Sequence, residues 1–259
     1  MSHTIKITDF PYLYEPHLHT KEGSACANNT AEELVHAYKE AGYSGIIVTD
    51  HFYRGNTAVD RNLSWEDWVE AYCKGYEKAK AVGDVIGLQV FFGWEESHQG
   101  TDFLIYGLGK EWLKQHPELR EVSIEEQYAL VHQAGGMVIH AHPYREAWYI
   151  PEIRLFPEYV DGVEIRNASH YGKVPGEDGR SMYDVQAQAY ADIHGLPYTG
   201  GSDIHSTSLL YGGMAFSRKL TDVFDYIQAV KNREGQPIDY FAIREKKEES
   251  GVRGEKYAF

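Results

Sequence analysis

Histidine and acidic side chains stand at the ends of successive strand-like segments of this chain. Four apolar runs end in this way, at His51, Glu95, His142 and His205. The run Gly45-Ile46-Ile47-Val48 has no polar residue, which is typical of a strand buried on both faces. Because the carboxyl ends of barrel strands meet at one rim, where the catalytic groups of such barrels lie, this register predicts a β/α barrel with a polar mouth.

Strand-like and helix-like segments alternate along the whole chain. Thr30 and Ser123 each begin a capping box, with glutamate three residues later, and mark the start of a helix. The pattern predicts helices over 30–42, 64–83, 123–135, 183–194 and 221–231. It predicts strands over 45–51, 85–92, 103–107, 137–143, 160–167, 196–205 and 238–243, followed by a solvated tail over 244–249. We find no linker, and expect one domain over 1–259, with its motifs between about 10 and 217.

His17 and His19 are one residue apart at the end of a short strand-like run. Side chains at positions i and i+2 of a strand leave by the same face, so both imidazoles can point at one spot. This is a geometry suited to binding a metal ion. Two ordinary histidines on a solvated strand face are the alternative for an isolated pair, and the later strand ends strengthen the metal interpretation.

Charge and composition limit the partners. The chain of 259 residues carries a formal net charge of -14, which repels nucleic acid and anionic membranes. A small phosphorylated substrate remains compatible, because a bound metal ion outweighs a distant acidic surface. Cys26 and Cys73 are too few for a zinc knuckle or a disulfide framework, and we expect reduced thiols. No apolar leader or long apolar segment occurs, so we expect a soluble, cytoplasmic protein.

Five motifs in order resemble the polymerase and histidinol phosphatase (PHP) family of metal-dependent phosphoesterases. They are His17-x-His19, Thr49-Asp50-His51, Glu95, Ala141-His142-Pro143 and Gly201-Ser202-Asp203-x-His205. The resemblance implies a distorted, TIM-like barrel of seven β/α units that holds two or three divalent ions, usually zinc, manganese or iron. It implies that one metal is held by His17, His19, Glu95 and Asp203. Glu95 would bridge to a second metal on His142, and His51 and His205 would belong to a third site.

The sequence departs from the family pattern in two places. Many members have a further histidine shortly after His-x-His, and the segment 21–27 has none. Glu22 could serve there as an oxygen ligand suited to manganese or magnesium, with a solvated loop glutamate as the alternative. Where the family often has a histidine before the fourth strand, this chain has Asp102, which could ligate the second metal or form a turn. His98 is the competing candidate.

Further polar residues near the predicted rim are candidates for catalysis. Arg145 could bind phosphate oxygens or form a salt bridge at the rim. Arg166 and His170 follow the sixth strand, where a substrate ligand or a proton donor to the leaving group is needed. Asp50, beside His51 in its motif, is a further candidate catalytic residue. His140 is expected on the same strand face as His142, as a supporting group or a further contact.

The residues together predict hydrolysis of a small phosphomonoester at a multinuclear metal site. Two divalent ions about 4 Å apart clamp the attacking and leaving oxygens of a displacement at phosphorus and activate a bridging water. The expected partner is a phosphorylated metabolite, histidinol phosphate being one of many, with no nucleic acid or membrane. An amidohydrolase-type barrel that cleaves C–N bonds is the first alternative, and a non-catalytic, metal-stabilised PHP module is the second.

Overall fold

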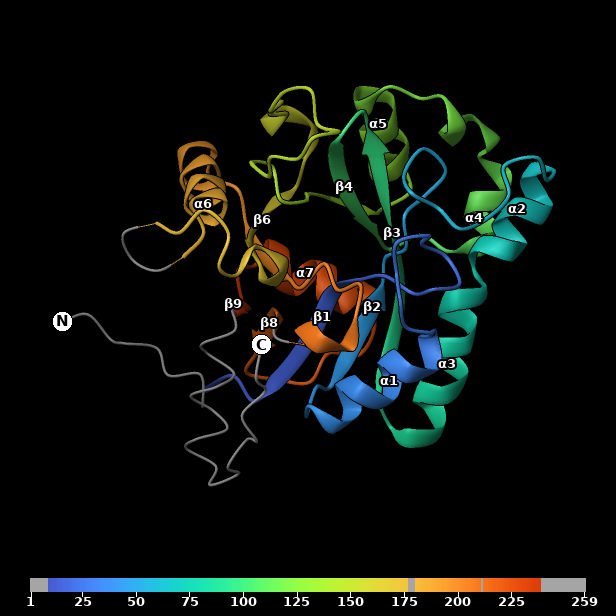
Figure 1. Ribbon diagram of the computed structural model, residues 1–259, viewed down its shortest axis with the longest axis horizontal. Coiled ribbons are helices and arrows are strands. Elements are labelled where there is room, and N and C mark those ends of the chain that lie inside the picture. The colour runs from blue at the N-terminus through green and yellow to red at the C-terminus, as the bar shows by residue number, and fades with distance from the viewer. Residues whose placement is uncertain (1–8, 177–179, 211, 239–259) are drawn as a thin grey trace.

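The computed structural model describes residues 9–176, 180–210 and 212–238 and contains one mixed β-sheet with helices around it (Figure 1). The strands are β1 Tyr12–Leu18, β2 Gly45–Val48, β3 Gln89–His98, β4 Thr101–Tyr106, β5 Met137–His140, β6 Gly162–Asn167, β7 Tyr198–Gly201, β8 Gly213–Phe216 and β9 Gln236–Ile238. The helices are α1 Ala31–Glu40, α2 Trp65–Tyr72, α3 Lys74–Ile86, α4 Lys110–Gln115, α5 Ile124–Gln133, α6 Met182–His194 and α7 Val223–Lys231. Among these residues, no helix is both long and apolar enough to cross a bilayer.

The sheet curves into a nearly closed barrel, which confirms the predicted α/β barrel. Its strand order is β7-β6-β5-β4-β3-β2-β1-β8-β9. Leu18, at the end of β1, forms a parallel bridge with Ile204, just after β7, so the two segments meet at the rim. At the other end of β1, residues Tyr12 to Tyr14 pair with antiparallel β8. The first seven strands thus form a distorted barrel. Below the rim, β8 and β9 lie between β1 and β7.

The interior of the barrel is apolar below its mouth. Tyr14, Ile47, Leu104, Ile139 and Met214 come from five strands and form one buried cluster with side chains of α7. Alternate residues of the same strands face outward, against α1 and α3 on one side and against α2, α4 and α5 on another. Because α7 and its apolar partners fill one end, the polar residues are left to gather at the other end.

Two predictions about the helical region over 64–86 are wrong: where it ends, and that it is one continuous helix. The residues Val85 and Ile86 belong to the last turn of α3, not to a strand, and Val85 is 85% exposed. The helix ends at Gly87, whose φ of 75° suits glycine, and not at Gly83. The predicted helix over 64–83 is divided at Cys73 into α2 and α3. By contrast, the capping boxes at Thr30 and Ser123 are both formed, as predicted.

The barrel departs from strict β/α alternation at β4. This strand is antiparallel to β3 and to β5, and the two-residue turn Gln99-Gly100, with φ of 55° and 84°, connects it to β3. The start of β4, not its end, therefore lies at the rim, and this places Asp102 there. The strand β8 was not expected from the sequence. Of the strand predicted over 238–243 only Ile238 is described, and the predicted tail over 244–249 lies outside the described residues.

Candidate metal centre

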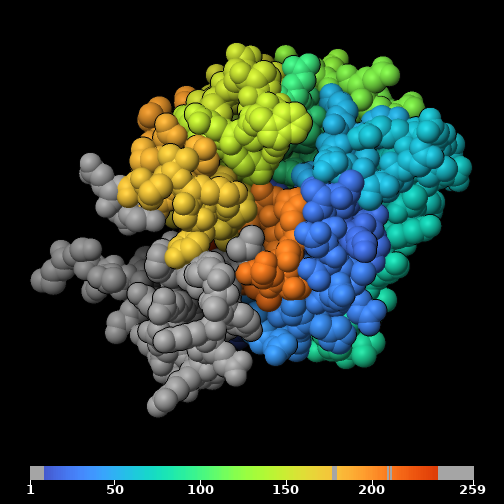
Figure 2. Space-filling model, in the orientation of Figure 1, coloured from blue at the N-terminus to red at the C-terminus, as the bar shows by residue number. Residues whose placement is uncertain are grey.

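Seven of the nine predicted ligands meet at the mouth of the barrel. They come from the ends of β1, β2, β3, β5 and β7 and are His17, His19, His51, Glu95, His142, Asp203 and His205. These residues form three overlapping groups, and within each group the ligand atoms lie within 4.8 Å of one another. The groups are His17 with Glu95 and His142, His17 with His19 and Asp203, and His19 with His51 and His205. In Figure 2 the orange segment after β7 lies between the blue segment after β1 and the gold segment after β6.

Glu95 lies at the centre of this cluster, which we call the rim cluster. Its Oε1 atom is 3.2 Å from Nε2 of His17 and 3.2 Å from Nε2 of His142. Its Oε2 atom is 2.6 Å from Nδ1 of His51 and 3.6 Å from Nε2 of His19. One carboxylate therefore contacts two separate pairs of imidazoles, as a ligand that bridges two cations does.

Several buried atoms of the rim cluster have no hydrogen-bond partner. These atoms are Nε2 of His17, Nε2 of His19, Oε2 of Glu95 and Oδ1 of Asp203. Oδ1 of Asp203 lies 3.1 Å from Nε2 of His19 and 3.6 Å from Nε2 of His17, without the geometry of a hydrogen bond. Because an unpaired buried polar group is costly, convergent unpaired nitrogen and oxygen atoms fit a site for divalent cations.

Glu164 orients the imidazole of His17 and holds the backbone of His142, and it was missed by the sequence interpretation. Its Oε1 atom is 2.8 Å from Nδ1 of His17, which leaves Nε2 of that ring for the cluster. Its Oε2 atom accepts hydrogen bonds from the backbone N–H of His142 and from Asn167. The sequence feature that could have identified Glu164 is its position as a single carboxylate between Val163 and Ile165, in a predicted strand that leads to the rim.

Electrostatics favour ionised carboxylates in the rim cluster. Burial opposes ionisation of Glu95, but the imidazoles of His51 and His17 hold its pKa well below the ordinary range. Burial likewise opposes ionisation of Asp203, and His17 together with other groups, including Arg145, lowers its pKa. Burial, reinforced by the nearby His51 and His205, lowers the pKa of His19. A neutral imidazole keeps the lone pair that a metal ion needs.

Two further predicted site residues lie away from the unpaired atoms. Glu22 accepts a hydrogen bond from the backbone N–H of Ala31 and another from Lys78, so it contacts α1 and α3 instead of the rim cluster. Asp50 accepts hydrogen bonds from Thr20 and from Ser24. Ser24 in turn contacts Nδ1 of His19 at 3.1 Å, so Asp50 supports the loop after β1 and reaches the imidazoles only indirectly.

Asp102, and not its competitor His98, faces the rim cluster. Oδ2 of Asp102 is 3.9 Å from Nε2 of His142 and accepts a hydrogen bond from Arg145. Arg145 also donates to Oδ2 of Asp203 at 2.7 Å, so its guanidinium joins the two carboxylates. His98 is instead bonded to Gln127 and to Arg54.

His140 does not share a face with His142, contrary to expectation. Its ring stacks on Phe103 and meets the edge of Tyr190 from α6, outside the barrel. His142 follows the strand and has a φ of 26°, and this turn directs it to the rim. The buried His170 contacts Asp184 through Nδ1 at 2.8 Å, has an unpaired Nε2, and lies 6.4 Å from His142 between ring centroids. Arg166 contacts Gln188 of α6.

Cys26 lies beside the rim cluster, a position that the sequence interpretation did not anticipate. Its half-buried thiol interacts with the imidazoles of His205 and His51. Burial opposes ionisation of this thiol, but the two imidazoles lower its pKa to about 6. Cys73, by contrast, is buried in the apolar cluster below α2, and burial raises its pKa to about 12.

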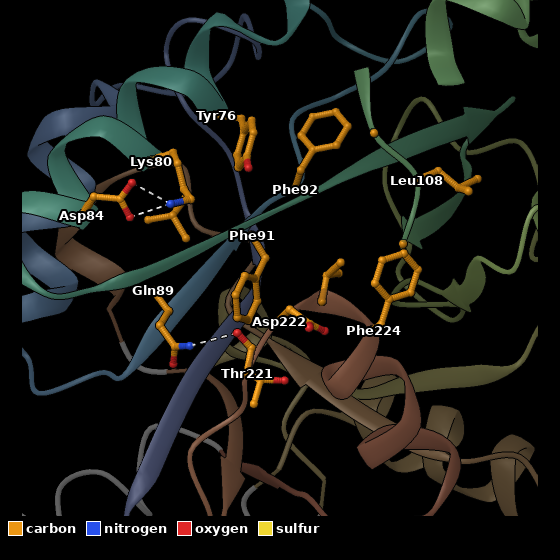
Figure 3. Close-up of a pocket in the computed structure, with 14 residues that line it drawn as sticks. Tyr76, Lys80, Asp84, Gln89, Phe91, Phe92, Leu108, Thr221, Asp222 and Phe224 are labelled. Atoms are coloured by element: carbon orange, nitrogen blue, oxygen red, sulfur yellow. Dashed lines mark hydrogen bonds and ion pairs between the residues drawn. The ribbon is translucent and has the colours of Figure 1, made fainter. Parts of the chain in front are cut away.

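One groove among the described residues lies away from the rim cluster. It has a volume of about 590 Å³ and is lined by side chains of α3, β3 and α7, among them Tyr76, Phe91 and Phe224 (Figure 3). It shares no residue with the rim cluster, and its polar groups include an ion pair between Lys80 and Asp84 on α3. Volume therefore does not locate the chemistry here, whereas convergent ligands do.

Solved structures with a similar fold carry the names of metal-dependent phosphoesterases. One is a two-domain protein with a predicted PHP-like metal-dependent phosphoesterase from Bacteroides vulgatus, at 13% identity and a TM-score of 0.63 over 90% of this chain and 66% of that one. Another, described as a metal-dependent phosphoesterase, is from Bifidobacterium adolescentis, at 17% identity and a TM-score of 0.53 over 85% of this chain and 96% of that one. PsfC from Pseudomonas syringae has 15% identity and a TM-score of 0.61 over 93% and 96%.

A structure of endonuclease Q, bound to duplex DNA with an abasic lesion, is also similar, at 13% identity and a TM-score of 0.53 over 85% of this chain and 56% of that one. No family model and no curated protein matches the sequence. The chain thus has the fold of PHP-like metal-dependent phosphoesterases. Its rim carries a histidine and carboxylate cluster suited to divalent metal ions.

Proposed function

We propose that this protein is a metal-dependent phosphoesterase that hydrolyses a small phosphomonoester within a single domain. The observation that carries the proposal is the convergence of unpaired, buried ligand atoms from His17, His19, Glu95 and Asp203 at one barrel mouth. Zinc, manganese or iron in two or three sites would supply Lewis acidity toward phosphate oxygens and a water that ionises near neutral pH.

The residues of this chain would hold and orient those ions. Asp203, His17 and His19 form one group of ligands, and Glu95 connects it to His142. Asp102 lies beside His142 and extends this second group. Glu164 fixes the ring of His17 so that Nε2 faces the mouth. The rings of His51 and His205 have centroids 4.2 Å and 4.5 Å from that of His19, and the three residues form a third group.

Two residues at the edge of the rim cluster suit substrate binding. Arg145 is directed at the mouth by Asp203 and Asp102, and its fork geometry matches two phosphate oxygens. His170 has Nδ1 paired with Asp184, and burial lowers its pKa. The neutral ring then presents Nε2 as an acceptor, which suits a substrate hydroxyl group better than protonation of a leaving group.

The charge of the molecule supports a small substrate over a polyanion. A net charge of -14 repels a nucleic-acid backbone and an anionic membrane surface at long range, while ions held at the mouth would neutralise a single phosphate group. The DNA-bound endonuclease Q nevertheless makes abasic duplex DNA a necessary substrate to assay. The free thiols of Cys26 and Cys73 support a reducing, cytoplasmic location.

The test combines elemental analysis of the purified protein with hydrolysis assays on an aryl phosphate, a panel of phosphorylated metabolites and abasic duplex DNA. His17→Ala and Asp203→Ala are each expected to lose metal and to reduce kcat/KM by on the order of a hundredfold or more, with the fold retained. His36→Ala, at an exposed position on α1, is the matched control and should keep both.

Three outcomes would contradict the proposal. Wild-type turnover in both variants would show that the site is wrongly assigned. Cleavage of C–N bonds without phosphatase activity would indicate an amidohydrolase. Full metal loading with no turnover on any phosphate ester would indicate a non-catalytic module.

A further inference from the structure

The loop after β5, residues 143–156, carries exposed aromatic side chains beside the rim cluster, and we call it the β5 loop. Trp148 is 96% exposed and Tyr149 is 49% exposed. Of the eleven exposed large hydrophobic residues in the part of the chain that the structure describes, six belong to the β5 loop or to the loop after β6. They are Trp148, Tyr149, Ile153, Leu155, Tyr171 and Val174. Single exposed hydrophobic residues are ordinary, whereas a group of them beside a polar site marks a binding surface.

The first half of the β5 loop is fixed to the rim cluster. The backbone N–H of Arg145 donates to the carbonyl oxygen of His142 at 3.0 Å. The guanidinium of Arg145 donates to Asp203 at 2.7 Å and to Asp102 at 3.2 Å. Trp148 is three residues further along the chain, so its Cα atom lies within about 11 Å of that of Arg145. The indole is therefore within the length of a small substrate from Arg145.

The second half of the β5 loop is fixed to the turn between β3 and β4. A tight turn, in which the N–H of Ile150 donates to the carbonyl oxygen of Ala147 at 3.0 Å, reverses the chain. Ile150 packs against the β3–β4 turn so closely that a methyl group on Gly100 would lie 3.0 Å from its Cγ1 atom. Arg154 donates to Oγ1 of Thr101 at 3.1 Å. Because both halves are held, the tip of the loop is presented on a fixed frame.

The β5 loop folds over the rim. One small cavity is lined by His142 and Asp102 of the rim and by Ile150 and Ile153 of the loop. In Figure 2 the yellow-green surface that includes the β5 loop borders the gold segment after β6 and the orange segment after β7. The tip of the loop therefore lies beside the mouth where the rim cluster would hold a phosphate group.

The chemistry of the tip favours an aromatic ring as its ligand. Trp148 and Tyr149 meet edge to face, with ring centroids 5.6 Å apart and planes at 87°. Since Trp148 is almost fully exposed, the faces of its indole are open for another ring to stack on. A polyanion is disfavoured there, because Glu146 and Glu152 add exposed carboxylates to the same loop and the chain has a net charge of -14.

We propose that Trp148 and Tyr149 bind the ring of an aromatic phosphomonoester whose phosphate group lies at the rim cluster. The inference rests on the proposed function and adds the substrate class to it. The ring lies away from the reacting phosphorus, so its contact with Trp148 is the same in the bound substrate and in the transition state. Loss of this contact should therefore raise KM and leave kcat unchanged.

The test measures binding of phosphonates to the metal-loaded protein by calorimetry, because their C–P bond keeps binding separate from hydrolysis. The wild type should bind 3-phenylpropylphosphonate about tenfold more tightly than propylphosphonate. Trp148→Leu keeps an apolar side chain without an indole face and should lose most of this difference, whereas Trp148→Phe should keep part of it. Ile193→Ala, at a position on α6 that is 79% exposed, is the matched control and should bind like the wild type.

A second readout is quenching of tryptophan fluorescence by acrylamide. Trp68 and Trp94 are fully buried, so the exposed Trp148 should contribute strongly to quenching. Addition of 3-phenylpropylphosphonate should reduce quenching in the wild type but not in Trp148→Leu. With an aromatic phosphate ester that the wild type hydrolyses, Trp148→Leu should raise KM about tenfold and leave kcat within about twofold.

The outcomes separate this inference from the proposed function. Equal affinity of the wild type for the two phosphonates would overturn the inference and leave the metal centre standing. Loss of self-association, or of binding to single-stranded DNA, in Trp148→Leu without any effect on phosphonates would assign the tip to a second copy or to nucleic acid. Failure of both phosphonates to bind would contradict the proposed metal centre and, with it, this inference.

Discussion

Buried histidines in this protein divide into those that face the rim cluster and those that are held neutral in apolar or hydrogen-bonded surroundings. His17 and His19 have unpaired Nε2 atoms at the mouth of the barrel. His98 lies outside it, hydrogen-bonded to Gln127 and beside the guanidinium of Arg54. The second kind affects stability, not binding, because a proton on such a ring is disfavoured by burial and by the neighbouring charge.

The pH dependence of stability tests the role of His98. Burial lowers its pKa from 6.5 to about 4, so between these values the unfolded chain binds a proton that the folded protein does not. Stability should therefore fall as the pH decreases from 6.5 to 4, by up to about 1.4 kcal/mol per pH unit from this group. In His98→Gln this contribution should vanish, which urea unfolding at a series of pH values will measure.

The control for this experiment is His194→Gln, at an exposed position on α6. It removes a histidine without removing a buried ring. The role assigned to His98 is wrong if His98→Gln and the wild type show the same change of unfolding free energy over this pH range.

At this scale the sequence placed side chains well where a strand end determined them. His51, His142, Asp203 and His205 follow strands whose apolar runs are evident, Glu95 lies in β3 just after its apolar run, and all five reach the rim. The sequence failed where a turn or a tertiary contact decides. The φ of 26° at His142 separates it from the face of His140. Cys26 was interpreted only through the count of cysteines, because its loop reaches the rim through a tertiary hydrogen bond from Asn28 to His205, which are far apart in the sequence.

Among the elements, α3 supports the rim through a glycine. A methyl group on Gly75, near the start of this helix, would lie 2.4 Å from Oγ1 of Thr20 and 2.9 Å from Oδ2 of Asp50. Thr20 and Asp50 are hydrogen-bonded to each other and hold the loop after β1. The close approach of α3 to this loop therefore requires a residue without a side chain.

Replacing this glycine should reverse the usual effect of alanine in a helix. Gly75→Ala is expected to destabilise the protein by about 1 to 3 kcal/mol, because the methyl group overpacks the contact with Thr20 and Asp50. It should also weaken metal binding through the displaced loop. Urea unfolding and a metal titration with a competing chelator measure the two effects.

Gly109→Ala is the matched control, because nothing lies within 4 Å of a methyl group there and its φ of -114° suits any residue. Equal stability of the two variants would show that α3 has room to move away from the loop.

The succession of elements was largely predictable, since hydrophobic runs and capping boxes are local signals. The direction of β4 and the existence of β8 were not. Both depend on pairing between strands: β4 reverses at the Gln99-Gly100 turn, and β8 is selected by its antiparallel partner β1. The residues Val85 and Ile86 were assigned to a strand for a different reason, because an apolar pair gives no sign that a helix continues to Gly87.

For the whole molecule, the rim cluster couples stability to metal binding. Unpaired buried atoms in Glu95, Asp203 and two histidines are a cost that a bound cation removes. Removing metal with a chelator should therefore lower the midpoint of thermal unfolding. At a free ion concentration one hundred times Kd, restoring the ion should stabilise the fold by about 2.7 kcal/mol.

Calorimetry of the metal-free and reloaded protein measures this difference. Asp203→Ala should respond less to the ion, because one ligand is missing. Identical unfolding with and without metal would contradict the view that the cluster is a cation site in the folded state.

The bridge between Leu18 and Ile204 has a consequence for biosynthesis. His17 and His19 leave the ribosome early, and their partner Asp203 is added nearly two hundred residues later. The ligands on β1 therefore have no Asp203 to meet until the last barrel strand has been synthesised and docked. Tight metal binding therefore has to follow translation of β7. A nascent chain that ends before Asp203 lacks this ligand and cannot yet form the complete site.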